Sequence, residues 1–109
     1  MTTQLVFRAL ADPTRREILV MLSQQDMTIA EVSDNFDMTR AAVKKHLTVL
    51  QDGQLISVRT QGRSRVNQLE PHALKAAGEW LEYFRQFWDD RFAALNMAIE
   101  ADKSTGDDT

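Results

Sequence analysis

The chain has 109 residues, of which 43% are apolar and 27% are charged, and its formal net charge at neutral pH is −3. This length allows one compact domain with a single core, and the acidic balance excludes a protein that coats nucleic acid indiscriminately. The sequence has no cysteine for a disulfide or a thiolate metal site and no apolar run long enough for a signal peptide or a membrane span, so we expect a cytoplasmic protein without membrane association.

The N-terminal part is predicted to form two helices. The first is a short amphipathic segment that contains Leu5 and Val6. Asp12 followed by Pro13 predicts the start of the second helix, because aspartate accepts hydrogen bonds from exposed amides and proline lacks the amide that would remain unpaired. One face of this helix is apolar and is expected in the core: Ile18, Leu19 and Leu22.

Two further capped helices are predicted between residues 28 and 52. Thr28 with Glu31 three residues later matches a capping box, and Thr39 begins the next helix in the same way. The short segment between them leaves room only for a tight turn, so the two helices must cross steeply, as in a helix-turn-helix. The second helix is expected to end at Gly53, since glycine readily takes the left-handed conformation after a helix.

The helix that begins at Thr39 has a polar and basic outer face. Projected at about 100° per residue, Val43, Leu47 and Leu50 form a buried stripe, and the opposite arc has no large apolar side chain. Arginine can bridge guanine O6 and N7, glutamine can pair with adenine, and lysine or threonine can hold a phosphate. We therefore expect this helix to contact DNA through Thr39, Arg40, Ala41, Lys44, Lys45, Thr48 and Gln51.

A β-hairpin with a basic tip is predicted after Gly53. The apolar period changes to two over residues 55–59 and 64–69, and Gly62 supplies a positive φ in the turn between them. Residues 39–65 carry a net charge of +5, so the rest of the chain carries −8. We expect Arg59, Arg63 and Arg65 to reach phosphates or the minor groove. An ordinary solvated surface is the alternative for both the helix and the hairpin.

A single long helix is predicted from Pro71 to about Ala101, with a broad apolar face that one small domain cannot cover. A twofold dimer would bury this face. The expected interface comprises Leu5, Val6, Trp80, Leu81, Phe84, Phe87, Trp88, Phe92 and Leu95. The alternatives are that the aromatic residues all lie in the core of one chain, or that Trp80, Phe84 and Trp88 line an apolar pocket for an unidentified small-molecule effector. Residues 1–102 are expected to form the domain and residues 103–109 a disordered tail.

The sequence predicts no enzyme. Two histidines, no cysteine and four glycines cannot assemble a catalytic triad, a metal cluster or a phosphate-binding loop, so we predict no catalytic residue, no metal ligand and no cofactor. His46 falls toward the buried side of its helix and is expected to be packed and hydrogen-bonded. His72 follows Pro71 at a helix start and is expected to have no chemical role.

Three blocks of the sequence, residues 7–19, 38–50 and 53–63, resemble the ArsR-type family of winged-helix repressors in the expected order. The resemblance implies a homodimer that binds an inverted-repeat operator, with the N-terminal helix and the long C-terminal helix at the dimer interface. The stretches that carry metal ligands in the metal sensors of that family correspond here to residues 28–34 and 80–90, which contain neither cysteine nor histidine. The chain is therefore more similar to the metal-independent branch, which includes repressors of their own operons.

We thus expect a mainly α-helical winged helix-turn-helix with a small β-hairpin wing, dimerised through its N- and C-terminal helices. The expected function is sequence-specific binding of double-stranded DNA by a homodimeric transcriptional repressor. The alternative is a winged-helix module that binds another protein through its aromatic C-terminal helix. Neutralising the basic residues at 40, 44, 45 and 63 distinguishes them, because only DNA binding requires these charges.

Overall fold

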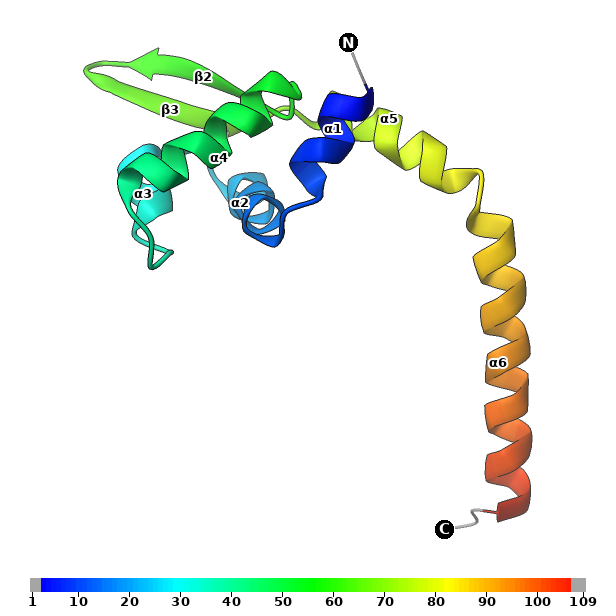
Figure 1. The fold of residues 1–109 in the computed structure, drawn as a ribbon. Coiled ribbons are helices and arrows are strands. Elements are labelled where there is room, and N and C mark those ends of the chain that lie inside the picture. The colour runs from blue at the N-terminus through cyan, green and yellow to red at the C-terminus, as the bar shows by residue number, and fades with distance from the viewer. Residues whose placement is uncertain (1–2, 107–109) are drawn as a thin grey trace. The chain divides into compact units, whose positions relative to one another are not determined.

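The computed structural model describes residues 3–106, without the side chains of residues 92, 93 and 100–106. The chain divides between Ala77 and Gly78 into two units, which are described separately. The elements are α1 (Thr3–Leu10), α2 (Pro13–Gln24), β1 (Met27–Thr28), α3 (Ile29–Ser33), α4 (Arg40–Asp52), β2 (Ile56–Gln61), β3 (Ser64–Leu69), α5 (Pro71–Glu82) and α6 (Arg85–Gly106) (Figure 1).

A small antiparallel sheet forms the wing of the first unit. Its strands lie in the order β1-β3-β2, with β2 and β3 paired along their whole length from Ile56 opposite Leu69 to Gln61 opposite Ser64. Gly62 in the hairpin turn has a φ of 64°, as predicted. The strand β1 was not predicted, because a segment of two residues is too short to show a period. The expected fold class, mainly helical with a small β wing, is confirmed.

The predicted helix caps are present. The carboxylate of Asp12 accepts a hydrogen bond from the amide of Arg15 at 3.0 Å, and Pro13 occupies the first turn of α2. Both halves of the capping box between Thr28 and Glu31 are formed at the start of α3. These contacts satisfy amides that a helix start otherwise leaves unpaired, so the local sequence alone determines where the two helices begin.

The end of α4 differs from the prediction. Gly53 has a φ of −81°, and the left-handed residue is Gln54, with a φ of 61°. The structure gives another reason for glycine at position 53: a Cβ there would lie 3.0 Å from the carbonyl oxygen of Leu5 in α1. Gly53 is therefore needed because two backbones approach each other closely, not for its freedom to adopt a positive φ.

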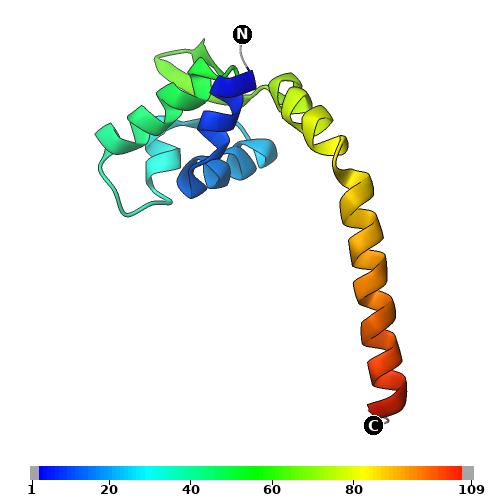
Figure 2. The same cartoon turned by 45° about the vertical axis from the view of Figure 1, so that its right-hand side comes forward.

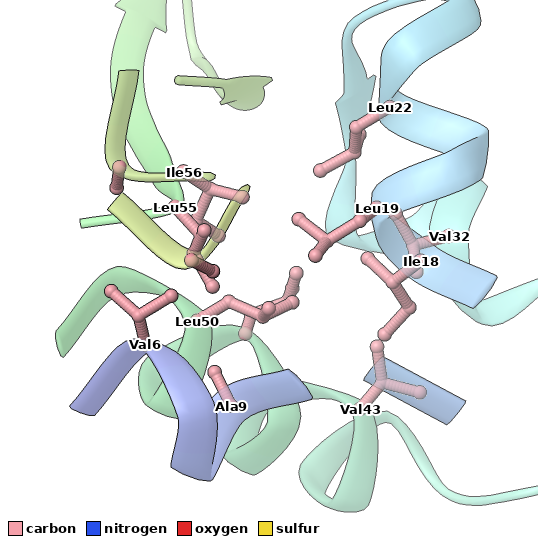
Figure 3. Close-up of a cluster of buried hydrophobic side chains, with 13 residues drawn as sticks. Val6, Ala9, Ile18, Leu19, Leu22, Val32, Val43, Leu50, Leu55 and Ile56 are labelled. Atoms are coloured by element: carbon pink, nitrogen blue, oxygen red, sulfur yellow. The ribbon is translucent and has the colours of Figure 1, made fainter. Parts of the chain in front are cut away.

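The core of the first unit lies where α1, α2 and α4 meet the sheet (Figure 3). In both ribbon views α1 lies beside α4 (Figure 1, Figure 2). The predicted buried stripe of α4 is confirmed, since Val43, Leu47 and Leu50 are all buried. Val6 belongs to the same core and is 1% exposed, which corrects its assignment to the dimer interface: a side chain enclosed within one chain offers no surface to a partner.

The predicted single helix from Pro71 is wrong, because the structure ends α5 at Glu82 and begins α6 at Arg85. At the break, the amides of Tyr83 and Phe84 bond to carbonyls only three residues back, at 3.3 and 3.0 Å. Such bonds tighten the last turn of a helix, and aromatic residues have a weaker helical preference than straight-chain ones. No proline or glycine occupies positions 79–88, so no residue type that commonly breaks a helix marks this position.

Two further observations concern the ends of the chain and its relation to membranes. The helix α6 continues to Gly106, beyond the domain boundary expected at residue 102, and residues 107–109 lie outside the described residues. Among the described residues, no helix has both the length and the apolar composition that crossing a membrane requires.

Candidate nucleic-acid interface

The candidate interface is built on α4. The hydroxyl oxygen of Thr39 accepts a hydrogen bond from the amide of Ala42 at 3.1 Å and so fixes where the helix begins. Burial of the opposite stripe then turns a fixed arc of α4 toward solvent. The seven candidates on this helix are all exposed, as expected: Thr39, Arg40, Ala41, Lys44, Lys45, Thr48 and Gln51.

The two threonines of this arc differ in the hydrogen bonds they can offer. The Thr39 hydroxyl already accepts from an amide, so its proton remains available for a phosphate oxygen. The Thr48 hydroxyl donates to the carbonyl of Lys44 at 3.0 Å, which leaves its oxygen as an acceptor, and the same exposed side chain carries a methyl group. Thr39 therefore suits a phosphate contact, and Thr48 suits a base edge or a thymine methyl group.

A groove of about 450 Å³ separates α4 from the wing. Its floor is largely apolar and includes Leu47 and Val58, while Arg40, Lys44 and Arg65 supply positive charge. Within the described part of the chain, no carboxylate lines the groove. The groove thus brings together six of the predicted DNA-binding residues, which come from two separate elements: Arg40, Ala41, Lys44, Thr48, Gln51 and Arg65.

A second hollow beside α4 adds a cation that the sequence did not indicate. It is lined by Lys45 together with Arg8 from the last turn of α1, and also by Asp52. The signal was weak in the sequence, because Arg8 precedes α4 by more than thirty positions and stands alone among uncharged neighbours. Packing of α1 beside α4 brings the two side chains to one surface, so Arg8 joins the candidate interface.

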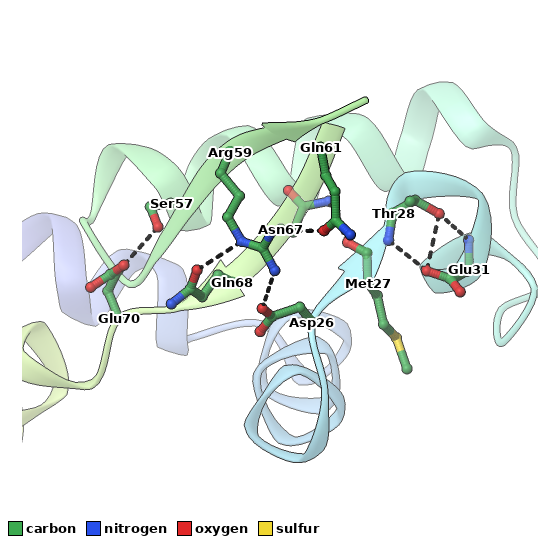
Figure 4. Close-up of polar contacts among 10 residues, drawn as sticks. All are labelled: Asp26, Met27, Thr28, Glu31, Ser57, Arg59, Gln61, Asn67, Gln68 and Glu70. Atoms are coloured by element: carbon green, nitrogen blue, oxygen red, sulfur yellow. Dashed lines mark hydrogen bonds and ion pairs between the residues drawn. The ribbon is translucent and has the colours of Figure 1, made fainter. Parts of the chain in front are cut away.

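Arg59 lies on the opposite face of the sheet (Figure 4). Its guanidinium forms an ion pair with Asp26 at 2.7 Å and hydrogen bonds to Gln61 at 2.8 Å and Gln68 at 3.3 Å. Successive strand residues point to opposite faces, so Val58 faces the groove and its neighbour Arg59 does not. The structure therefore does not bring Arg59 to α4, and Arg63 stands exposed at the hairpin tip, outside the groove.

The second unit presents aromatic side chains. Phe84 is half-buried between Trp80 and Tyr83, with ring centroids 4.9 Å from each, in edge-on geometry. The remaining expected interface residues of this unit whose side chains are described are exposed: Trp80, Leu81, Phe87, Trp88 and Leu95. The side chain of Phe92 lies outside the described residues.

The alternative of an effector pocket lined by Trp80, Phe84 and Trp88 finds no matching cavity among the described residues. Trp80 packs against Phe84, whereas Trp88 lines a different, shallow hollow. No group of three or more histidine, cysteine, aspartate or glutamate side chains gathers in the described residues to hold a metal ion.

Comparison with known proteins matches the part of the chain that contains α4. Residues 12–58, which include α4 and the first half of β2, match the family described as bacterial regulatory protein, arsR family. The HTH-type transcriptional regulator Rv2034 of Mycobacterium tuberculosis is 35% identical over 103 residues, covering 94% of this chain and 91% of that protein. The chain belongs to the arsR family. The transcriptional repressor SdpR of Bacillus subtilis is 32% identical over 79 residues, covering 72% of this chain and 88% of that repressor.

Solved structures agree with the family assignment. An ArsR-like transcriptional regulator from Rhodococcus sp. RHA1 superposes with a TM-score of 0.72 at 32% identity and covers 90% of both chains. The resemblance read from the three sequence blocks is thereby confirmed, and so is the winged helix-turn-helix fold of this arsR-family protein. The arsenical resistance operon repressor of Staphylococcus xylosus is also similar, at 27% identity over 77% of this chain and 74% of that repressor.

Proposed function

We propose that this arsR-family protein is a cytoplasmic, homodimeric repressor that binds double-stranded DNA at an inverted-repeat operator. The observation that carries the proposal is the groove between α4 and the wing. Arg40, Lys44 and Arg65 give it three positive charges, Thr48 and Gln51 can also hydrogen-bond to base edges, and no carboxylate of the described residues lines it. Such a local basic surface on an acidic chain suits one stretch of duplex DNA rather than any polyanion. The names of the relatives support a regulator and do not favour the protein-interaction module.

We assign the major groove to α4. Its exposed arc carries arginine, lysine, threonine and glutamine within one face, and these side chains match the donor and acceptor pattern of base edges there. Arg40 and Gln51 are the proposed base readers, and Lys44, Lys45 and Arg8 the proposed phosphate contacts. Arg65 and Arg63 on the wing extend the contact toward the neighbouring minor groove.

A homodimer accounts for the exposed apolar residues of the second unit. Trp88 and Leu95 are 46% and 52% exposed, and an aromatic and aliphatic face of this kind is typical of a protein interface. Two copies related by a twofold axis would place two α4 helices roughly 34 Å apart, one turn of DNA. We propose that Leu5 of α1, which is half-buried, joins this interface, and that Val6 does not.

We further propose that binding to the operator requires no metal ion. The chain has no cysteine, and its two histidines, His46 on α4 and His72 on α5, belong to different helices. A thiolate or multi-histidine site of the kind that soft or borderline metals prefer cannot be assembled from these residues within one chain. Operator affinity should therefore be the same in the presence of a chelator as in its absence.

The proposal is tested by selection from a pool of random duplexes, followed by titration of the enriched sequence at several salt concentrations. We expect enrichment of two copies of one half-site in inverted orientation, with centres about 10 base pairs apart. The affinity for this duplex should exceed that for a scrambled duplex and fall steeply with salt. Failure to bind either duplex at low salt would reject DNA binding and favour a partner protein on the aromatic helix.

A further inference from the structure

The side chain of Arg15, which belongs to α2, contacts both α1 and α4. It lies in the first turn of α2, and its guanidinium donates to the last carbonyls of α1: Nε to Ala9 at 2.9 Å and Nη2 to Arg8 at 3.0 Å. The remaining terminal nitrogen, Nη1, lies 3.1 Å from Nδ1 of His46 on α4. One planar side chain with fixed donor directions thus connects α1, α2 and α4.

The position of this guanidinium is fixed by the start of α2. The amide of Arg15 donates to the Asp12 carboxylate, and this hydrogen bond lowers the pKa of Asp12 below its usual value. Asp12 is therefore an anion at neutral pH beside the arginine. Its Oδ2 also lies 3.9 Å from Nδ1 of His46. Arg15 and Asp12 are the charged groups of the described chain for which the structure gives a contact with the His46 ring.

The contact determines the protonation state of His46. A guanidinium has five donors and no acceptor, so a hydrogen bond between Nη1 and Nδ1 requires Nδ1 to carry no proton. The imidazole must then be neutral, with its proton on Nε2. Adding a proton to Nδ1 would bring two donors and two positive charges together and would favour Asp12 as the partner instead.

We propose that Arg15 and His46 are positioning residues for DNA binding: together they hold α4 at the rotation about its axis that presents Lys44 and Lys45 to DNA. This proposal rests on the proposed function. Neither residue belongs to the exposed arc of α4, and the His46 side chain is 22% exposed. Because His46 follows Lys45 directly, a change in how His46 is held changes the direction of the adjacent cations.

The first test compares Arg15→Lys with Arg16→Lys. Lysine keeps the charge but carries its donors on a single nitrogen, so it cannot span the three acceptors that the planar guanidinium reaches. Arg15→Lys should therefore lower operator affinity by roughly twofold to thirtyfold. Arg16 is the matched control, because it also donates to a carbonyl of α1, Leu10 at 2.8 Å, but has no recorded contact with α4. Equal affinities for the two variants would overturn the role of Arg15.

The second test asks whether the hydrogen-bond acceptor at position 46 is required. His46→Asn keeps an acceptor close to the position of Nδ1, so its operator affinity should stay near the wild-type value, whereas His46→Ala offers Arg15 no acceptor and should lose about as much affinity as Arg15→Lys. His72→Ala removes the other histidine, which is exposed on α5, and should bind as the wild type does. Wild-type affinity in His46→Ala would refute the positioning role of His46.

The tautomer of His46 is measured separately from DNA binding, by nitrogen NMR of the imidazole in free protein at neutral pH. A proton on Nε2 is expected, and a proton on Nδ1 would refute the contact with Arg15. If the expected tautomer is found but no selected duplex binds the wild type, then the proposed function fails and the positioning role fails with it. The hydrogen-bond network would still be established by that result.

Discussion

The two units of this chain use their apolar residues in opposite ways. In the first unit, α1, α2 and α4 enclose a core whose largest side chains, including Ile18, Leu50 and Leu55, are fully buried. In the second unit, the large apolar residues of α6 whose side chains are described are exposed, as Phe87, Trp88 and Leu95 show. Burying apolar surface is the main stabilising contribution to folding and association. The first unit obtains it within one chain, and we propose that the second obtains it by binding a second copy.

This difference separates two tasks along the sequence. The first unit contains the candidate DNA surface, and the second contains all of the proposed dimer surface except Leu5. Variants of one unit should therefore change one property and leave the other unchanged, unless the operator requires both copies at once. The predictions below test this separation.

The largest effect is expected from removing residues 79–109. The truncated chain should sediment as a monomer, because the exposed aromatic face is gone, while circular dichroism should show that the first unit stays helical. Operator affinity should fall by roughly 10²- to 10⁴-fold, since two half-sites would no longer be bound by one linked particle. A truncated chain that still dimerises would show that the proposed interface is in the wrong unit.

The next comparison sets Leu50→Ala against Leu95→Ala. Leu50 is fully buried, so its truncation should cost about 2–5 kcal/mol of the free energy of unfolding at every protein concentration. Leu95 is exposed, so its truncation should act on the dimer and alter how the urea midpoint depends on concentration. Urea unfolding at several concentrations measures both. The same response for both variants would contradict the division of roles.

Within the first unit, Lys44→Ala and Arg59→Ala distinguish the two faces of the sheet. Lys44 lines the groove, so removing it should reduce the slope of operator affinity against salt concentration by about one unit. Arg59 is paired with Asp26 on the other face, and its removal should leave the slope unchanged. Both variants should dimerise normally in sedimentation. A reduced slope for Arg59→Ala would place that face on DNA as well.

The smallest effect concerns Asp12 and acid. The amide of Arg15 lowers the pKa of Asp12 in the folded chain, so Asp12 adds stability above its unfolded pKa of about 3.9 and loses it as pH falls through the lower folded value. Asparagine caps α2 equally well but does not titrate. Asp12→Asn should match the wild type near pH 7 and lose less stability below pH 4 in thermal melts. Parallel melting curves over this range would show that the contact has no effect on stability.

The helix caps, the buried stripe of α4 and the turn at Gly62 were predicted from local sequence signals. Each of these depends on residues within a few positions of one another, which is why the sequence alone predicted them. The same holds for most of the candidate interface, because burial of Val43 and Leu47 determines which arc of α4 faces outward. The charged and polar residues of the groove were predicted from the sequence. The groove itself was not, because Arg65 lies near α4 only through packing of the wing.

The features that were missed depend on contacts between distant residues. The ion pair of Arg59 with Asp26 spans 33 positions, and the close approach of Gly53 to Leu5 spans 48. Neither contact is accompanied by an apolar period or a sequence motif that would predict it. Burial of Val6 likewise depends on α4 lying beside α1. The break between α5 and α6 had a local cause, but aromatic residues bend a helix too rarely to be a signal without structure.

Thr28 serves two elements at once, with a mechanical consequence. It pairs with Val66 as the last residue of β1, and it caps α3 as the first half of the box with Glu31. No residue therefore separates the end of β1 from the cap of α3. Any tilt of the wing against α3 must break either a strand pair or a cap. Thr28 thus ties the edge strand of the wing to the start of α3 in the free chain.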